Sequence, residues 1–290
     1  MATLKGQTAI ITGASAGIGE AIARNLARAG ATVVITARRQ ERLDTLKKEI
    51  EQSGGQAIVL AGDINSADDR QHLLKETLKA TGRIDALINN AGYGQRGPVE
   101  LVPMDAIRQN FETNFFSVVD LTQQVIPIMR KQNSGRIVNI SSVAGKVSRP
   151  FASIYSATKF ALEAISDGIR LELAPFGIQV VVIEPGFITT EFSGTANEIA
   201  KPIIEQDSPY KPFLSGSAEG DRQIRKMAGT PDEIASLVHL ALTADKPKAR
   251  YAAPGHAKLA IALKRWLPEK MYENLVKKSS GMRVDKPKSL

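Results

Sequence analysis

The sequence predicts an α/β protein with a doubly wound parallel sheet, helices on both faces and a C-terminal helical extension. Short apolar runs rich in Val and Ile recur six times, which is typical of strands buried on both faces of a sheet. Longer segments with apolar residues at three- and four-residue spacing, such as AGIGEAIARNLARAG, lie between these runs and indicate helices. The first run leads directly into a glycine-rich turn, the place where such sheets bind ligands. These observations favour a regular alternation of strand and helix within one domain.

Each apolar run marks one expected strand. The runs are 8–12 (TAIIT), 32–37 (TVVITA), 57–61 (AIVLA), 86–89 (ALIN), 136–140 (RIVNI) and 179–184 (QVVVIE). The helical segments close on Gly, as helix C-termini often do, and each crossover between parallel strands must be right-handed. After the sixth strand, residues 186–230 are rich in Gly, Pro and Ser and are expected to form a lid or binding segment. A helix at about 231–244 follows.

Composition excludes several classes of function. With 290 residues, of which 43% are hydrophobic and 23% charged, the chain matches an ordinary globular protein. The absence of Cys excludes disulfides and thiolate metal ligands. The three histidines, His72, His239 and His256, are scattered, so no metal is expected. The first residues show no export signal and no apolar run is long enough to span a membrane, so we expect a cytoplasmic protein.

The net charge of +8 is concentrated at the C-terminus. Residues 247–290 contain eleven Lys and Arg against three acidic residues, whereas residues 1–246 contain 27 of each. An apolar stripe at helical spacing runs through the same region: Leu259, Ala262, Leu263, Trp266 and Leu267. Pro268 is expected to open a second short helix. Residues 247–290 therefore form a basic amphipathic extension.

The glycine-rich turn TGASAGIGEAIA has the chemistry of a phosphate-binding turn. Gly13, Gly17 and Gly19 lie between the first strand and the first helix. Glycine lets the backbone approach a pyrophosphate closely, and the N-terminus of the following helix attracts its negative charge. A merely tight turn would use the same residues, so this signal is weak when taken alone.

The spacing Gly-x-x-x-Gly-x-Gly resembles that of the short-chain dehydrogenase/reductase family rather than the Gly-x-Gly-x-x-Gly of most dinucleotide-binding folds. Further motifs of the family follow in its order: Asp63 in AGDI, NNAG at 89–92, Asn114, NISS at 139–142, YSATK at 155–159 and PGFITT at 185–190. The resemblance covers about residues 5–245, and the layout is closest to that of steroid- and retinoid-type members. It implies one Rossmann-type catalytic domain over residues 1–246, with the substrate segment at about 186–230.

The resemblance implies a nicotinamide cofactor, and the charges favour NADP(H). An acidic residue after the second strand would bind the ribose hydroxyls of NAD, but Ala37 stands there. Arg38 and Arg39 follow, and their guanidinium groups suit a 2′-phosphate, with Arg38 the preferred ligand. Both would also suit the solvated start of a helix. Asp63 corresponds to the family contact with adenine, although a turn-capping Asp would look the same. The residues that match the cofactor site of the family are Gly13, Ser15, Gly17, Ile18, Gly19, Arg38, Arg39, Asp63, Ile64, Asn90, Ala91, Gly92, Tyr155, Lys159, Pro185, Gly186, Ile188 and Thr190.

Tyr155 and Lys159 are the expected proton donor and its partner. At positions i and i+4 they project from one helix face, with Cβ atoms about 5–6 Å apart. A nearby ammonium is expected to lower the pKa of the phenol. Without its context the pair would also fit a solvated helix turn. The resemblance implies that Ser142 binds the same substrate oxygen, that Lys159 holds the nicotinamide ribose and that Asn114 supports a water chain to the lysine. A buried structural Asn would fit the sequence as well.

Together these residues predict an NADPH-dependent carbonyl reductase that transfers hydride to a ketone or aldehyde and is reversible as an alcohol dehydrogenase. A lipophilic substrate of steroid, retinoid or acyl type is favoured by four aromatic residues, unless they belong to the core: Phe187, Phe192, Tyr210 and Phe213. The alternative is a catalytically silent nucleotide-binding sensor or scaffold, although such proteins usually lack the Tyr or the Lys. A sugar-nucleotide epimerase or dehydratase would need a larger C-terminal domain.

Three interpretations of the basic extension remain open. It covers the substrate entrance, it lies on an anionic membrane surface, or it forms a solvated helix pair docked on the fold. Nucleic-acid binding is not expected, because no motif accompanies the charge. The family resemblance also implies a homodimer or homotetramer. We therefore expect a cytoplasmic enzyme with a small carbonyl or alcohol substrate, peripheral to a membrane only under the second interpretation.

Overall fold

The core of the molecule is a seven-stranded parallel sheet. The computed structural model describes residues 3–214 and 226–280. Within them the strands follow the order β3-β2-β1-β4-β5-β6-β7, and every neighbouring pair is parallel. The strands are β1 (Thr8–Thr12), β2 (Thr32–Thr36), β3 (Gln56–Val59), β4 (Ala86–Asn89), β5 (Gly135–Ile140), β6 (Ile178–Pro185) and β7 (Arg250–Ala253). The strand order reverses between β1 and β4, which places a ligand-binding crevice at the C-terminal ends of these central strands.

All six strands expected from the sequence are present, and the sequence analysis missed the seventh. β7 has the sequence RYAA, and only Ala253 of it is buried, so it lacks the apolar run that marks the others. It nevertheless pairs with β6, with Arg250 opposite Val182 and Ala253 opposite Pro185. The segment 247–290 therefore contributes an edge strand to the sheet as well as helices.

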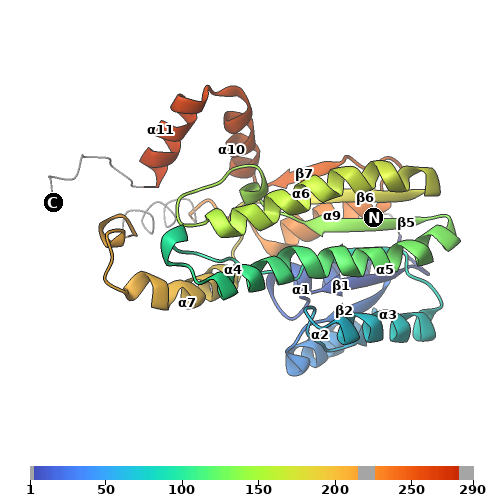
Figure 1. Cartoon of the computed structure of the whole chain (residues 1–290). Helices are drawn as coiled ribbons and strands as arrows, with labels where there is room; N and C mark the ends of the chain where they lie inside the picture. Colours follow the sequence, from blue (N-terminus) through green and yellow to red (C-terminus); the bar gives the residue numbers. More distant parts are fainter. Residues whose placement is uncertain (1–2, 215–225, 281–290) are drawn as a thin grey trace.

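Helices cover both faces of the sheet, as expected (Figure 1). One face carries α1 (Gly17–Arg28), α2 (Gln40–Gln52) and α9 (Pro231–Thr243); the other carries α3 (Ala67–Thr81), α5 (Ser117–Gln132) and α6 (Ser153–Leu173). Each layer closes an apolar cluster of fully buried side chains, with Ile22 and Ile234 in the first and Leu121 and Met129 in the second. The shorter elements are η1 (Val99–Leu101), α4 (Met104–Phe111), the π-helical turn η2 (Glu112–Phe116), η3 (Val143–Gly145) and η4 (Ala174–Phe176).

Local sequence signals set several helix ends. The Thr230 side chain accepts a hydrogen bond from the backbone N–H of Glu233 and so caps α9, the helix expected at about 231–244. Ser66 caps α3 in the same way by accepting from Asp69. Gly82 ends α3 in the left-handed conformation, as helix-terminating glycines commonly do.

The segment 186–230 is not the irregular loop that its composition suggests, because it contains α7 (Phe192–Glu205). The helix forms despite an internal proline because Ala196 and Ile203 are buried on one face of it. Residues 215–225 of the segment lie outside the described part of the chain.

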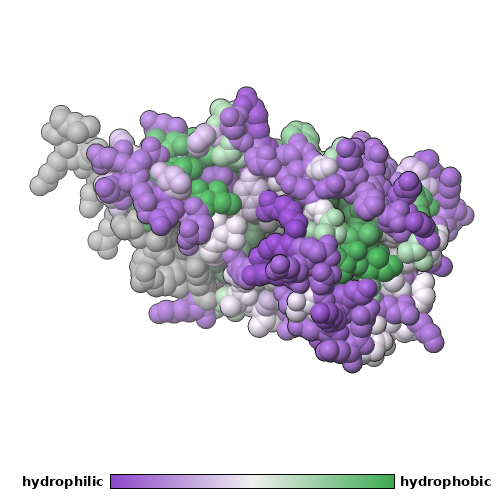
Figure 2. All heavy atoms as spheres, turned by 90° about the horizontal axis from the view of Figure 1, so that it is seen from below, coloured by the Kyte–Doolittle hydropathy of each residue, from purple (hydrophilic) through white to green (hydrophobic). Residues whose placement is uncertain are grey.

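The C-terminal extension forms two helices that project from one end of the molecule (Figure 1). α10 (Gly255–Trp266) is followed by Pro268, which opens α11 (Glu269–Ser279) as the sequence predicts. The apolar stripe expected on α10 lies at the surface, since Leu259 is 59% and Trp266 76% exposed. Figure 2, which views the molecule from below, shows hydrophobic side chains in two separate places, a smaller group toward the left end and a larger group right of centre.

Part of the extension lies outside the described residues. Four of its charged residues lie outside the described ranges: Arg283, Asp285, Lys286 and Lys288. Within residues 3–214 and 226–280, no helix combines the length and apolar character needed to cross a membrane.

Candidate active site

A cavity of about 1050 Å³ lies at the C-terminal ends of the strands. Segments that follow β1 to β6 all contribute to its wall, together with α7 and α10. Every residue assigned to the cofactor or catalytic site from the sequence lines this cavity, except Gly19 and Asn114, which lie behind the wall. The fold thus gathers into one place residues that are more than 170 positions apart in the chain.

The glycine-rich turn is locked against the segment after β4. Gly13 has a φ of +67°, which favours glycine, and an added Cβ at Gly19 would lie 2.5 Å from Asn90 Nδ2. The Asn90 side chain donates to the Thr12 carbonyl at 2.8 Å, and the backbone N–H groups of Asn90 and Ala91 both donate to Thr12 Oγ1 at 3.0 Å. The NNAG motif therefore fixes the shape of the glycine-rich turn from the neighbouring strand.

The two arginines after β2, Arg38 and Arg39, line the cavity on the side of the glycine-rich turn. Arg39 donates to the Ser15 hydroxyl through Nη2 at 3.1 Å and Nε at 3.3 Å. It also contacts Glu191 at 3.4 Å, and Arg42 contacts the same carboxylate at 2.8 Å. These contacts lower the pKa of Glu191, with the hydrogen bond from Arg42 the largest cause. Arg38, the preferred ligand on the sequence, is exposed and also lines the cavity.

Asp63 makes the turn-capping contact that was one of its two roles expected from the sequence. Its carboxylate accepts from the Asn65 backbone N–H at 3.0 Å. Its own backbone N–H donates to Asp69 at 2.7 Å. Asp63 also lines the cavity, and its contact with adenine stays a prediction.

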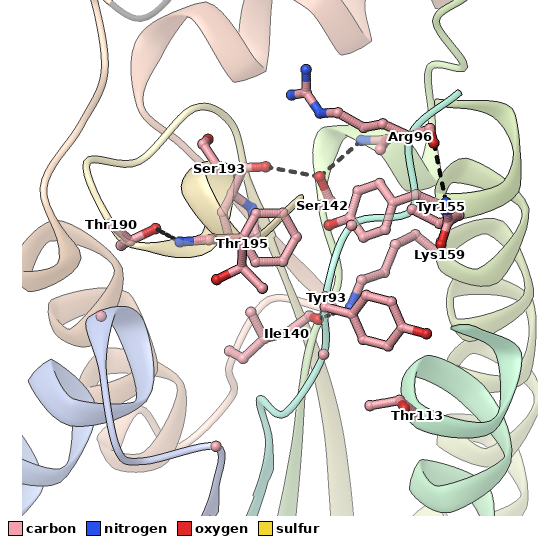
Figure 3. A pocket seen from close by; sticks show the side chains of 18 of the residues that line it. Tyr93, Arg96, Thr113, Ile140, Ser142, Tyr155, Lys159, Thr190, Ser193 and Thr195 are labelled. Carbon is pink, nitrogen blue, oxygen red and sulfur yellow. Dashed lines mark hydrogen bonds between the residues drawn. The ribbon is translucent and has the colours of Figure 1, made fainter. Parts of the chain in front are cut away.

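Ser142, Tyr155 and Lys159 converge at the other end of the cavity (Figure 3). Ser142 stands between β5 and η3, where its Oγ accepts from the Ala144 N–H at 3.0 Å. Tyr155 and Lys159 come from the first turns of α6, and the Lys159 ammonium lies 5.9 Å from the centroid of the Tyr155 ring. That ammonium donates to the Ile140 carbonyl at 2.8 Å. The phenol and the serine hydroxyl thus face one apolar space from two different elements.

Burial shifts the pKa of Tyr155 in the direction opposite to the one expected from the sequence. The sequence predicts a lowered pKa for Tyr155, but desolvation raises it to about 12, against smaller opposing effects of a hydrogen bond with Ser142 and of the Arg96 charge. Desolvation also lowers the pKa of Lys159 to about 8, and the negative charge of Glu163 opposes this change. In the protein alone, Tyr155 therefore keeps its proton throughout the neutral range.

Asn114 is held rigidly beside the catalytic helix. It is fully buried within the π-helical turn η2, an irregularity that often marks functional sites. Its Nδ2 donates to the Tyr93 carbonyl at 2.9 Å and to Thr158 Oγ1 at 3.1 Å, and its Oδ1 accepts from the Tyr93 N–H. An added Cβ at Gly92 would lie 2.9 Å from this Oδ1 and 3.8 Å from Lys159 Nζ, so the amide lies near the lysine.

The sequence analysis missed His256, which supports the wall of the cavity from α10. The Phe187 backbone N–H donates to His256 Nε2 at 3.1 Å, directly after Gly186. This contact requires the neutral ring, and burial lowers the pKa of His256. Its partner lies 69 positions away in the sequence, so only the pairing of β6 with β7 brings the two together.

Two of the four aromatic residues expected around the substrate line the cavity. Phe192 lies on the Tyr155 ring, with centroids 5.7 Å apart, and Phe187 lies next to His256. Tyr210 instead donates to Glu100 at 2.7 Å outside the cavity wall. Phe213 does not line the cavity either.

Comparisons with known proteins agree with this geometry. The family model for short chain dehydrogenases matches residues 7–201. The chain is 34% identical to YusZ, an uncharacterized oxidoreductase of Bacillus subtilis, over 93% of this chain and 97% of that protein. It is 31% identical to the 3-ketodihydrosphingosine reductase of Bacteroides thetaiotaomicron, over 92% of this chain and 95% of that protein. The solved structure of a variant actinorhodin polyketide ketoreductase with NADPH matches with a TM-score of 0.76 at 30% identity, over 89% of this chain and 99% of that chain.

Proposed function

The chain belongs to the short-chain dehydrogenase family, and on that premise we propose that it is an NADPH-dependent carbonyl reductase of a lipophilic ketone or aldehyde. The single observation that carries the proposal is the buried, protonated Tyr155 beside Ser142 in a largely apolar cavity.

The residues at the far end of the cavity fit a nicotinamide dinucleotide phosphate. α1 begins after Ala16 without a side-chain cap, so its first backbone N–H groups are available to a pyrophosphate. The Arg39 guanidinium and the Ser15 hydroxyl form a donor pair suited to a 2′-phosphate. Arg38 lines the same region and adds a second positive charge. The ketoreductase neighbour was solved with NADPH, which agrees with this choice of cofactor.

Tyr155 and Ser142 have different roles at the carbonyl oxygen of the substrate. Bound NADPH would supply the hydride to the carbonyl carbon. Tyr155 donates its proton to the oxygen as negative charge develops there, and Ser142 stabilises the same charge by a hydrogen bond. Lys159 lies below the phenol, and Asn114 fixes the neighbouring backbone. Because the pKa of Tyr155 is raised to about 12, the phenol carries at neutral pH the proton that ketone reduction requires. The reverse reaction, alcohol oxidation, would use the phenolate as the proton acceptor.

The apolar wall supports a lipophilic substrate. The apolar side chains that line the cavity include Phe187, Phe192, Ile199, Leu214 and Met227. A relative with 31% identity is named a 3-ketodihydrosphingosine reductase and a structural neighbour is named a polyketide ketoreductase, so both names describe ketone reduction. A ketone on a long or polycyclic hydrocarbon body would bury its apolar surface in this cavity.

The test is a screen for NADPH oxidation with steroid, retinoid, long-chain acyl and small ketones, with NADH as the control cofactor. With an active ketone, Tyr155→Phe should lower kcat by about 10²–10⁴. Tyr93→Phe is the matched control, because it removes another phenol from the same cavity wall and should leave kcat within about threefold. Normal turnover by Tyr155→Phe would refute the assigned proton donor.

A silent nucleotide sensor or scaffold is the less favoured alternative. Such a protein would keep the residues that bind the cofactor and lose those that catalyse the reaction. Here the candidate catalytic residues are all present and close together: Asn114, Ser142, Tyr155 and Lys159. Tight NADPH binding without turnover of any ketone in the screen would favour the scaffold.

We also propose that the enzyme is a homodimer or homotetramer. Large apolar side chains are exposed along α6 and at the start of α5: Phe116 (52%), Phe160 (44%) and Leu171 (77%). An exposed apolar face of this kind is typical of an interface. Light scattering coupled to size-exclusion chromatography should give a multiple of 31.3 kDa, and Leu171→Glu should reduce it. A wild-type monomer would contradict the proposal.

Peripheral contact with an anionic membrane is proposed for the extension. Leu259, Trp266 and Met271 are exposed on α10 and α11, and lysines and arginines accompany them on the same two helices. Sedimentation with anionic vesicles, but not with neutral ones, would support this contact. Absence of binding to anionic vesicles at low and at high salt would contradict it. A cytoplasmic location agrees with either result and remains a prediction.

A further inference from the structure

A cluster of charges built around two buried carboxylates lies behind the catalytic residues, and none of its members lines the cavity. The charge cluster consists of Lys146, Glu163, Asp167, Glu184 and Arg250. The side chains of Glu163 and Glu184 are each only 5% exposed. Lys146 contacts Glu163 at 2.8 Å and Glu184 at 3.9 Å, whereas Arg250 contacts them at 3.0 and 3.5 Å. Charges this deeply buried are costly unless they are paired, so their placement requires an explanation.

The charge cluster connects the elements that carry the reaction. Lys146 directly follows η3, the turn that begins after Ser142. Glu163 lies one helical turn after Lys159 on α6. Glu184 directly precedes Pro185 and Gly186 of the cavity wall, and Arg250 comes from β7. Ser142, Lys159 and Pro185 therefore each have a member of the cluster within four residues of them in the sequence.

Packing at Gly145 keeps these elements in direct contact. An added Cβ there would lie 3.0 Å from Glu163 Cγ and 3.0 Å from the Lys159 carbonyl oxygen. The backbone of η3 thus rests on the turn of α6 that joins Lys159 to Glu163. A displaced Glu163 would release the Ser142 turn and the lysine helix together.

The cluster also determines which charge faces Lys159. Burial raises the pKa of Glu184 to about 7, and the proximity of Glu163 adds to this. Glu184 is therefore close to half protonated at neutral pH. Glu163 lies between two cations, with Lys146 at 2.8 Å and Arg250 at 3.0 Å. Asp167, one turn further along α6, is paired with Arg250 and Arg170 at 2.6 Å each. Glu163 is thus the anion of the cluster that opposes the effect of burial on Lys159.

We propose that Glu163 is a positioning residue of the active site: it ties the Ser142 turn and the β6–β7 edge to the helix of Lys159, and it supplies the negative charge that keeps Lys159 protonated at neutral pH. The proposal rests on the carbonyl reductase function proposed above. Glu163 acts through Lys159 and does not touch the substrate.

The first test compares pH profiles of ketone reduction. In the wild-type enzyme, kcat should fall as pH rises through about 8, where Lys159 loses its proton. Glu163→Gln should move this alkaline limb to lower pH by roughly 0.5–1 unit and lower kcat at pH 8 by roughly 2–5-fold, with KM for the ketone within about twofold. Asp167→Asn is the matched control, because it removes a carboxylate of the same cluster one turn farther from Lys159. The alkaline limb of the Asp167→Asn pH profile should stay within about 0.2 pH unit of the wild-type limb.

A second variant makes the test independent of how well Glu163→Gln folds. Lys146→Gln removes a cation that neutralises Glu163, and the Lys146 side chain is 28% exposed, so the substitution is easier to accommodate. The alkaline limb should then move to higher pH, opposite to the shift in Glu163→Gln. Shifts in the same direction, or an unchanged limb in Lys146→Gln and in a folded Glu163→Gln, would overturn the proposal.

A measurement without substrate separates this inference from the proposed function. Acetic anhydride labels only unprotonated lysines, so labelling of Lys159 against pH, followed by mass spectrometry, reports its protonation directly. In Glu163→Gln the labelling midpoint should be lower than in the wild type. If the midpoint shifts but no ketone is reduced, the reductase assignment fails while Glu163 retains its role. If ketones are reduced and the midpoint is unchanged, the role of Glu163 is refuted alone.

Discussion

Arg39 gives the sharpest test of the proposed cofactor end. Arg39→Leu removes a guanidinium that the Ser15 hydroxyl already orients, at 3.1 and 3.3 Å. A hydrogen bond to a charged group contributes about 1.5–3 kcal/mol. The Arg39 side chain is 48% exposed, so solvent screening reduces the expected loss to about 1–2 kcal/mol. At about 1.4 kcal/mol for each factor of ten, NADPH should bind roughly 5–30-fold more weakly.

The assay is a fluorescence titration with NADPH and NADH in parallel. NADH lacks the 2′-phosphate, so its Kd should change less than about twofold in Arg39→Leu. Arg42→Leu is the matched control, because it removes a neighbouring arginine that pairs with Glu191 and should leave the Kd for NADPH within about threefold. Arg38→Leu should have a smaller effect than Arg39→Leu, since Ser15 orients Arg39. Equal weakening of NADPH and NADH would refute the assignment of a 2′-phosphate site.

Two further predictions concern the reacting end. The rate of ketone reduction should be nearly flat from about pH 6 to 7.5, because Tyr155, with its pKa raised to about 12, and Lys159, at about 8, both retain their protons there; a rate that rises from pH 7 to 9 would contradict this order. His256→Ala removes the acceptor of the Phe187 N–H and should lower kcat/KM by roughly 5–30-fold, the effect of about 1–2 kcal/mol, while the Kd for NADPH changes much less; equal changes in both would show a general loss of structure.

The sequence by itself identified six of the seven strands and the motifs that gather at the cavity. Buried parallel strands are recognisable because they are apolar on both faces, and this pattern identified β1 to β6. Catalytic and cofactor residues are recognisable because turns and chemistry restrict residue type: the glycine turn, the NNAG segment and the Tyr155–Lys159 spacing each permit few substitutes. The cavity lies where these motifs meet.

Tertiary structure decided the features that depend on pairing between distant segments. β7 is a short, largely unburied edge strand that forms by pairing with β6. α7 is stabilised by the face that it buries rather than by its composition. His256 meets Phe187, and Arg250 meets Glu163, only after β7 is in place. The pKa of Tyr155 depends on burial, which outweighs the hydrogen bond with Ser142 and the charge of Arg96. Spacing along one helix is local and can be read from residues, whereas desolvation and ion pairing are properties of the assembled fold.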